Sequence, residues 1–442
     1  MQNHAQNNAE LIHRSLSSVW HPCSQMKQYE TFPLIPLECG KGVWLYDFEG
    51  NRYLDAVSSW WVNLFGHCNP RINAALKDQL ERLEHAMLAG FTHEPVIELS
   101  ERLRGIAPAG LGHCFYGSDG ASATEIALKM SAHYWRNMGK PAKTQFISLK
   151  NSYHGETLGA LSVTDVTLFR DAYGALISQQ ATVESPDTRL AAPGESFEDF
   201  AKRCAAMLDD HLQRHHEKIA AFIIEPLVQG AAGMAVHHPI YLTLARQICD
   251  RYGVHLIADE IAVGMGRTGT MFACEQGRIS PDFLLLSKGI TGGYLPLSVV
   301  MTKDEIYHAF YDDNSARGFL HSHSYTGNPL ACRAALATLD IFLQDDVLNA
   351  NRRKAEYLNR ISEPLRGMPA VRNWRNTGMI WAFEVDSRLD NFPQRCFQMG
   401  LQHELLLRPM GSTVYFMPPY VVDDEEMQLL VERTMLVVEA LA

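Results

Sequence analysis

Long apolar runs are absent from this chain of 442 residues. No stretch approaches the roughly 18 to 20 apolar residues that a membrane-spanning helix needs, so we expect no membrane partner. The opening residues, MQNHAQNNAELIHR, are polar and lack the apolar centre of a secretory signal. These absences together favour a cytoplasmic protein.

Blocks of like charge are also absent. The chain has 39 Lys and Arg against 50 Asp and Glu, a formal net charge of -11. A nucleic-acid surface needs clustered basic residues, so we expect no nucleic-acid partner. The nine cysteines show no Cys-x-x-Cys spacing, which favours reduced thiols over a disulfide framework. No His-Glu-x-x-His motif occurs, and although His321 and His323 could share a face of a strand, no third ligand is evident. We therefore expect no metal site.

The apolar residues that are present predict an α/β fold. A chain of this length favours two domains. Between about residues 110 and 305, apolar runs alternate with segments of helical periodicity, which predicts a mainly parallel sheet. After residue 330 the order helix, two strands and a closing helix predicts a smaller α+β domain. The predicted strands of the sheet are 144–150, 220–227, 254–261, 282–288 and 297–303, and those of the smaller domain are 378–385 and 412–420.

Two charged residues stand at the carboxyl ends of predicted strands, where α/β sheets bind ligands. Asp259 follows one strand and Lys288 ends the next. Each has an ordinary explanation by itself, as a turn-capping acid or a solvated lysine. Together they match pyridoxal phosphate (PLP) chemistry. That chemistry needs an amine for a Schiff base, an acid facing the pyridine nitrogen, and donors for a phosphate.

The segment GSDGASATEIALKM supplies candidate phosphate donors. Ser122 and Glu125 have the spacing of a capping box, which predicts that a helix starts here. The amides of residues 120–122 and the positive end of the helix dipole would form an anion site. By itself this is only a capped helix, and Lys288 and Asp259 are what make it a predicted phosphate cradle.

A second glycine-rich segment, Gly264 to Gly269, matches the Gly-x-Gly-x-x-Gly pattern of dinucleotide sites. No helix pattern opens directly on it, so we do not expect a nicotinamide cofactor. We interpret this loop, with Arg267, as a wall of the active site.

An ordered set of motifs resembles the class III, fold-type I aminotransferases: KNSYHGET, IIEPLVQG, IADEIAVGMGRTG, LLLSKGITGG and TGNPLACRAA. The resemblance implies PLP as cofactor and a homodimer with shared active sites. It also implies a large domain at 61–330 with a mainly parallel seven-stranded sheet and a small α+β domain at 331–442. Residues 1–60 would contribute to the small domain and the active site.

The resemblance also implies a role for each cofactor residue. Lys288 would form the Schiff base and move the proton, Asp259 would face the ring nitrogen, and Tyr153 would stack on the ring. The remaining expected cofactor residues hold the phosphate or shape the ring pocket. They are Gly120, Ala121, Ser122, His154, Glu225 and, from the other subunit, Ser324.

Four further segments (20–26, 55–67, 133–140 and 406–420) are similar to the branch that aminates 8-amino-7-oxononanoate in biotin synthesis. S-Adenosylmethionine is the favoured donor and lysine the alternative. Two other activities stay open: a general ω-amino-acid or diamine aminotransferase, and a non-catalytic PLP-binding regulator. The expected substrate residues, besides Tyr153 and Lys288, are Trp60 and Trp61 along the aliphatic chain, Arg408 at a carboxylate, Tyr415 beside it, and Cys23 and His323, where this branch has tyrosine and proline.

Overall fold

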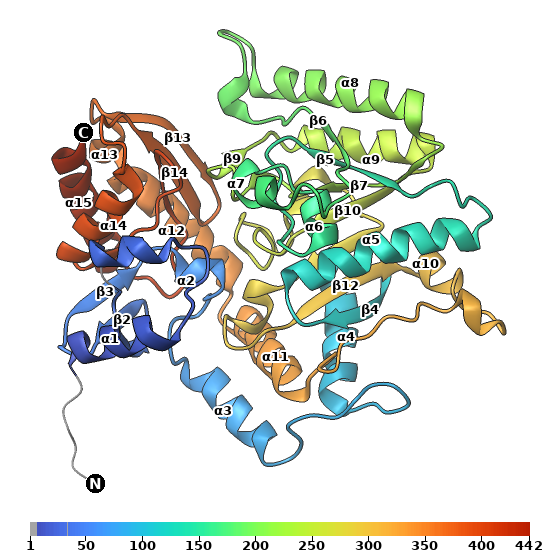
Figure 1. Cartoon of the computed structure of the whole chain (residues 1–442), viewed down its shortest axis with the longest axis horizontal. Helices are drawn as coiled ribbons and strands as arrows, with labels where there is room; N and C mark the ends of the chain where they lie inside the picture. The colour runs from blue at the N-terminus through green and yellow to red at the C-terminus, as the bar shows by residue number, and fades with distance from the viewer. Residues whose placement is uncertain (1–6, 33) are drawn as a thin grey trace. The chain divides into compact units, whose positions relative to one another are not determined.

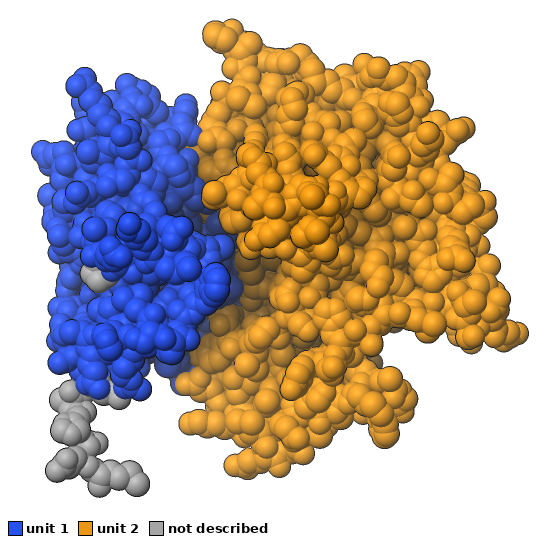
Figure 2. Space-filling model, in the orientation of Figure 1, with its two compact units in different colours: residues 1–70, 353–374, 382–442 blue, residues 71–352, 375–381 orange. Residues whose placement is uncertain are grey.

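The computed structural model describes residues 7–32 and 34–442 (Figure 1). Its contacts divide the chain into two compact units (Figure 2). Unit 1 comprises residues 1–70, 353–374 and 382–442, and unit 2 comprises 71–352 and 375–381. The unit boundaries thus fall about ten and about twenty residues later than the domain boundaries expected at 60 and 330. One reason is that α11 (Pro329–Gln344) packs on α4 (Glu94–Ile106) in unit 2.

Unit 2 contains a seven-stranded sheet of order β4-β12-β11-β10-β7-β5-β6. Strand β12 runs antiparallel to both its neighbours, and the remaining pairs are parallel. The prediction of an α/β fold with a mainly parallel seven-stranded sheet is confirmed. The strands are β4 (Leu111–Gly117), β5 (Gln145–Leu149), β6 (Ala181–Val183), β7 (Ile219–Ile224), β10 (His255–Asp259), β11 (Phe283–Leu286) and β12 (Ser298–Lys303).

The central strands are buried along their whole length, which explains their unbroken apolar sequence. Every residue of β7, β10 and β11 is buried. Strand side chains such as Ile257 and Leu285 join one core cluster with Ile126 of helix α5 (Gly120–Asn137). The other main helices of this unit are α3 (Pro70–Leu80), α8 (Phe197–His215) and α9 (Ile240–Tyr252).

Helix α9 follows the predicted pattern, with Leu242, Ala245, Ile248 and Cys249 all buried. It ends at Gly253, whose φ of 59° lies in the left-handed region that glycine adopts without strain.

Helix α5 (Gly120–Asn137) does not start as the sequence suggested. Its N-cap is Asp119, whose side chain accepts a hydrogen bond from the Ser122 amide. Ser122 is therefore already inside the first turn, and the predicted Ser122–Glu125 capping box is wrong. Glu125 instead accepts hydrogen bonds from Thr157 and from the amides of Gly159 and Ala160.

Unit 1 carries two small sheets. One has the order β1-β2-β3-β15 and was not predicted; the other, β13-β14-β16, includes both strands predicted for the smaller domain. Their bounds are β1 (Leu37–Lys41), β2 (Trp44–Asp47), β3 (Arg52–Asp55), β15 (Leu405–Leu406), β13 (Val371–Thr377), β14 (Ile380–Val385) and β16 (Thr413–Phe416). The main helices are α1 (Asn8–Ser18), α12 (Val347–Ile361), α14 (Phe392–Gln402) and the predicted closing helix α15 (Asp424–Leu441).

Among the described residues, no helix combines the length and the hydropathy needed to cross a membrane.

Candidate active site

Six strands of the large sheet end at the same edge. Because all its strands except β12 run in one direction, the residues that follow them meet at the carboxyl edge. Within this edge Asp259 pairs in register with Leu285 of β11, and Ala258 pairs with Ile224 of β7. The residues brought to this edge include Asp259, Lys288, Glu225, Tyr153, His154 and Gly120.

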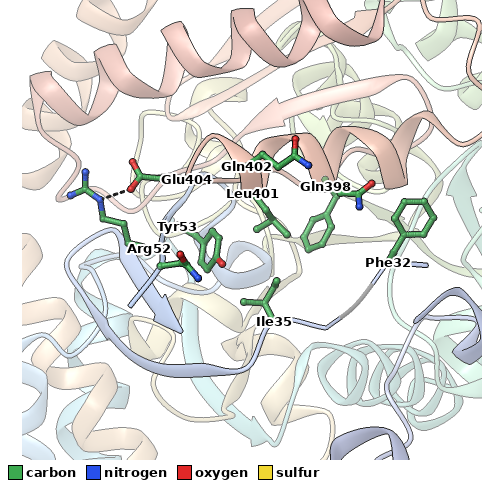
Figure 3. Close-up of a pocket in the computed structure, with 10 residues that line it drawn as sticks. Phe32, Ile35, Arg52, Tyr53, Gln398, Leu401, Gln402 and Glu404 are labelled. Atoms are coloured by element: carbon green, nitrogen blue, oxygen red, sulfur yellow. Dashed lines mark hydrogen bonds and ion pairs between the residues drawn. The ribbon is translucent and has the colours of Figure 1, made fainter. Parts of the chain in front are cut away.

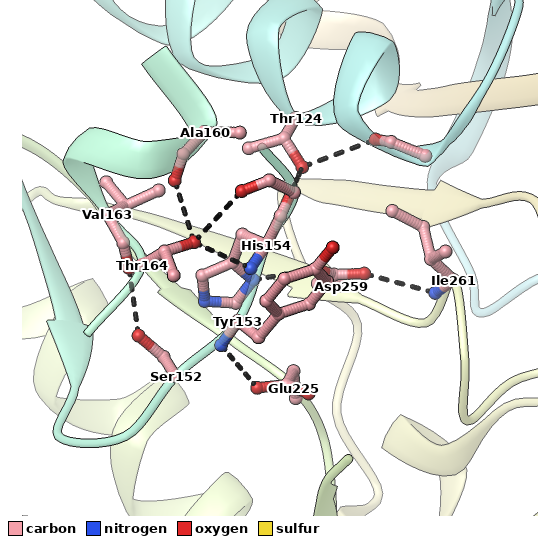
Figure 4. Close-up of polar contacts among 12 residues, drawn as sticks. Thr124, Ser152, Tyr153, His154, Ala160, Val163, Thr164, Glu225, Asp259 and Ile261 are labelled. Carbon is pink, nitrogen blue, oxygen red and sulfur yellow. Dashed lines mark hydrogen bonds and ion pairs between the residues drawn. The ribbon is translucent and has the colours of Figure 1, made fainter. Parts of the chain in front are cut away.

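Asp259 is held by a buried histidine (Figure 4). The His154 Nδ1 lies 2.6 Å from Asp259 Oδ2, and both side chains are almost wholly buried. Since an ionised carboxylate only accepts hydrogen bonds, Nδ1 carries the proton and donates it. The Ile261 amide donates to Asp259 Oδ1 at 3.1 Å. The carboxylate is thus fixed in orientation while lone pairs remain for a further donor.

His154 itself is positioned through its backbone. Its amide donates to Thr164 Oγ1 at 3.0 Å, and its carbonyl accepts from Thr124 Oγ1 at 2.8 Å. The Nε2 atom is buried and has no hydrogen-bond partner among the described residues. His154 was expected among the residues that hold the phosphate or shape the ring pocket. Its contact with Asp259 was not predicted, because no spacing signal connects residues 105 positions apart.

Glu225 lies just past β7, as expected, and joins the segment carrying Tyr153 to the site. Its Oε2 accepts from the Tyr153 amide at 3.0 Å and its Oε1 from the Gly230 amide at 2.9 Å. Burial raises the pKa of Glu225 to about 7, and the negative charge of Asp259 adds to this effect. The Tyr153 hydroxyl donates to Glu156 Oε1 at 2.8 Å.

Lys288 opens the short 3-10 helix η5 (Lys288–Thr291) directly after β11. Its φ of 45° lies in the left-handed region, which is uncommon for a residue with a side chain. Desolvation lowers the pKa of its ammonium, against the opposing effect of the Asp259 and Glu225 carboxylates. A lowered pKa favours the neutral amine, the form that can attack a carbonyl carbon.

The N-terminus of α5 lies where the anion cradle is predicted. The first amides of a helix have no acceptor within it, and here these belong to Gly120, Ala121 and the capped Ser122. A side chain at Gly120 would approach Ile261 Cγ2 to 2.9 Å, and one at Gly155 would approach Ala121 Cβ to 2.6 Å. Gly120 lets the helix start pack close to the segment after Asp259, and Gly155 lets it pack close to the segment after β5. The donors of the cradle, the buried Asp259 acceptor and the lysine fit a PLP group.

His323 and Ser324 lie in a segment without regular structure, so the suggestion that His321 and His323 share a strand face is wrong. His323 Nδ1 lies 3.1 Å from Ser118 Oγ, two residues before the helix start, and its Nε2 lies 3.2 Å from His321 Nε2. Ser324 is exposed. Within the described chain, no group of three or more His, Cys, Asp or Glu side chains could hold a metal ion.

Four of the expected substrate residues cluster within unit 1. The Trp61 indole donates to the Tyr415 hydroxyl at 3.0 Å, and both side chains are buried. The Arg408 guanidinium lies 4.5 Å from the centre of the Trp60 ring, which is 42% exposed. The adjacent tryptophans belong to a single turn, Ser58–Trp61. Cys23, the remaining expected substrate residue of this unit, is exposed.

A separate pocket of about 410 Å³ in unit 1 contains none of the predicted site residues (Figure 3). Its wall combines the apolar side chains of Phe32, Ile35 and Leu401 with the amides of Gln398 and Gln402.

Comparison with known proteins agrees with this geometry. The family model for class III aminotransferases matches residues 25–438. The adenosylmethionine-8-amino-7-oxononanoate aminotransferase of Helicobacter pylori is 46% identical over 93% of this chain and 94% of its own. The crystal structure of the Methanocaldococcus jannaschii enzyme of that name has a TM-score of 0.92 and 33% identity, covering 98% of this chain and 100% of its own. An ω-transaminase from Pseudomonas jessenii, solved in complex with PMP, has a TM-score of 0.92 at 29% identity and covers 97% of this chain and 98% of its own.

The seven-stranded sheet is that of a fold-type I, PLP-dependent transferase. The chain belongs to the class III aminotransferases, and its cofactor is PLP.

Proposed function

We propose that the chain transfers an amino group to 8-amino-7-oxononanoate, giving 7,8-diaminononanoate for biotin synthesis. The observation that supports amino transfer is the convergence of Lys288 with the His154-held Asp259 at one sheet edge. The substrate is supported by the names of the relatives, one of which is 46% identical over almost the whole chain.

Asp259, Lys288 and the helix start would hold the cofactor. Asp259 would accept a hydrogen bond from the protonated ring nitrogen, and the amides at Gly120 and Ala121 would donate to the phosphate. When bound, PLP supplies an electron-withdrawing ring that stabilises negative charge on the substrate carbon next to nitrogen. Tyr153 would cover the ring face.

Lys288 would act as the proton carrier. Its pKa, lowered by burial, lets Nζ accept a proton from the substrate carbon and then return it elsewhere. His154 keeps Asp259 oriented throughout, because the Nδ1 proton is committed to Asp259 Oδ2. Glu225 fixes the segment that carries Tyr153 by accepting the Tyr153 amide.

The cluster in unit 1 would recognise the oxo acid. Arg408 has a planar guanidinium suited to a carboxylate, and its contact with the Trp60 ring limits its freedom. Trp60 offers an exposed apolar face for an aliphatic chain. Tyr415, held by Trp61, would lie beside the carboxylate. S-Adenosylmethionine would be the amino donor, with lysine as the alternative.

We also propose a homodimer in which Ser324 reaches the other subunit's phosphate site. Exposed apolar side chains surround Ser324 in sequence and space: Leu320, Tyr325 and, on the neighbouring segment, Met87 and Phe91. The two segments are joined where Asn328 donates to the Glu84 carbonyl at 3.0 Å. Such a patch marks a surface that a partner covers. The nine free cysteines support a reducing compartment, hence the cytoplasm.

The test is a donor and acceptor screen with purified protein. 8-Amino-7-oxononanoate should be aminated with S-adenosylmethionine. Failure with both S-adenosylmethionine and lysine, together with amination of simple ω-keto acids, would overturn the proposed substrate. That outcome would favour the second candidate, a general ω-transaminase, which the similarity to the Pseudomonas jessenii enzyme supports.

A further inference from the structure

The turn that carries the two tryptophans has an unusual backbone. Four consecutive residues have positive φ: Ser58 at 51°, Ser59 at 47°, Trp60 at 73° and Trp61 at 71°. None is glycine, and each costs free energy in this left-handed conformation because its Cβ crowds the backbone. A run of four persists only where the surroundings hold it in place.

One buried carboxylate holds the start of the turn. Asp55, at the end of β3, is fully buried. Its Oδ1 accepts from the Val57 amide at 3.3 Å and the Ser59 amide at 2.9 Å, and its Oδ2 accepts from Ser59 Oγ at 2.7 Å. The Ser58 hydroxyl meanwhile donates to the Met417 carbonyl at 2.7 Å. The bonds that the Asp55 carboxylate accepts are charge-assisted, and such bonds are the stronger ones in proteins.

A histidine fixes the carboxylate in turn. His67 Nε2 lies 3.0 Å from Asp55 Oδ2 and, facing an acceptor, must donate. Its Nδ1 lies 3.2 Å from Asn63 Nδ2, which suits the tautomer with the proton on Nε2. The His67 backbone is bonded in both directions to Gly42, with N···O distances of 2.7 and 3.2 Å. The β1-β2 hairpin thus anchors the histidine.

The turn sends its two tryptophans to different surroundings. Trp61 is 6% exposed and donates to Tyr415, whereas Trp60 is 42% exposed and meets Arg408. In an extended segment the backbone bonds of this turn would be lost, including the one from the Trp61 amide to the Val57 carbonyl at 2.9 Å. The position of Trp60 against Arg408 therefore depends on the left-handed turn.

We propose that Asp55 and His67 are positioning residues for substrate recognition: they hold the left-handed turn that places Trp60 against Arg408. The pair sets the affinity for the carboxylate-bearing oxo acid without contacting it. This inference rests on the proposed function for its substrate, although the turn itself can be tested without turnover.

The experiment compares Asp55→Asn and His67→Gln with wild type, each as the PLP-loaded protein. Asp55→Asn should raise KM for the oxo acid about tenfold or more, because a charge-assisted hydrogen bond is lost. The value of kcat should change little. Acrylamide quenching of Trp60, isolated by subtracting the Trp60→Phe protein, should increase. His67→Gln should shift both measurements in the same direction and by less.

Asp47→Asn is the matched control. Asp47 is another buried carboxylate of unit 1 with several accepted hydrogen bonds, including those from Tyr53 and the Asn51 amide, but it does not touch the turn. Its replacement should leave KM and Trp60 quenching near wild type even if stability falls. Equal effects of the two substitutions would overturn the proposal.

A rescue separates positioning from general damage. Glycine adopts the left-handed region freely, so adding Ser59→Gly to Asp55→Asn should lower the raised KM several-fold. No recovery would count against a role in holding the turn. If wild type does not aminate the oxo acid, the proposed function fails, while the quenching comparison still decides whether Asp55 holds Trp60.

Discussion

His154 Nδ1 donates to Asp259 Oδ2 over 2.6 Å, and both side chains are buried. The His154 amide also donates to Thr164 Oγ1, and the Ile261 amide donates to Asp259 Oδ1. The contact between His154 and Asp259 joins the segment after β5 to the end of β10 and gives the ring-facing acid a single orientation.

Replacing His154 by Ala should therefore impair the reaction while the protein still folds. Loss of a hydrogen bond to a charged group lowers kcat by about ten- to a hundredfold. The cofactor's absorption band should also change its pH dependence, which a spectroscopic titration measures. His113→Ala, which breaks an exposed His–Asp pair with Asp304, is the control and should leave both unchanged. A wild-type titration in His154→Ala would contradict the role.

Lys288→Ala should abolish covalent attachment of the cofactor. Loss of a positioned proton carrier costs roughly 10² to 10⁴ in rate, and the missing covalent bond adds to this. Borohydride reduction followed by peptide mass spectrometry should find the cofactor on wild-type Lys288 and on no peptide of the variant. Lys150→Ala, at an exposed lysine paired with Glu184, should keep both label and activity. Label retained in Lys288→Ala would disprove the assignment.

The sequence predicted the elements whose pattern is local. Burial on both faces gives β7, β10 and β11 their unbroken apolar runs, and burial on one face gives α9 its helical spacing. Both patterns can be read directly from the order of residues. Lys288 and Asp259 were found for a related reason, because strand ends in a parallel sheet meet at one edge.

The parts that were missed depend on contacts distant in sequence. Strands β1, β2 and β3 are short and half-exposed. They pair with one another, and the sheet is completed where β3 pairs with β15, some 350 residues later. The N-cap of α5 was wrong by three residues because Asp119 and Ser122 both suit a cap and only the backbone conformation decides between them. Nothing in the order of residues revealed the left-handed turn at Ser58, which depends on Asp55 and His67.

Glu225 should make the apo-protein less stable as pH rises. Its pKa is about 7 in the folded protein against an ordinary value of 4.5, so between these values the folded state binds more protons and stability falls with rising pH. The effect approaches about 1.4 kcal/mol per pH unit within that window. Glu225→Gln removes this contribution, which urea unfolding between pH 4.5 and 7 measures as a difference from wild type.

Comparing wild type with Glu225→Gln cancels the contributions of the other titratable groups to the pH dependence of stability. Burial lowers the pKa values of His237 and His255 to about 4, so these residues make the protein less stable as pH falls from 6.5. Both histidines are present in each protein. Glu260, also raised to about 7, gives a matched variant, Glu260→Gln, that should change the slope similarly without altering the cofactor site. An unchanged slope in Glu225→Gln would refute the assignment.

Arg408→Lys should weaken binding of the oxo acid more than that of the donor. A lysine keeps the charge but loses the planar fork and the broad contact with the Trp60 ring, so KM for the oxo acid should rise about tenfold. Arg52→Lys is the control, because Arg52 also lies on a tryptophan, 4.4 Å from the Trp44 ring, outside the cluster. Steady-state kinetics with each substrate varied in turn will show whether the change is confined to the oxo acid. A parallel rise for the donor would argue against a dedicated carboxylate site.

Asp282→Asn should destabilise the protein without changing its chemistry. Asp282 is buried just before β11 begins, at the edge opposite Lys288, and its carboxylate accepts from Arg246 and Lys303, each at 2.7 Å. Its pKa is lowered by these cations in spite of burial. An amide removes the carboxylate that both cations share and leaves Arg246 with Asp250 alone. Breaking one partner of such a buried network costs about 3 to 5 kcal/mol. Urea unfolding of the holoenzyme should show this loss, whereas the cofactor spectrum and kcat below the unfolding range should match wild type. A variant as stable as wild type would show that the network contributes no net stability, and a changed spectrum would show that the two edges of the sheet are coupled.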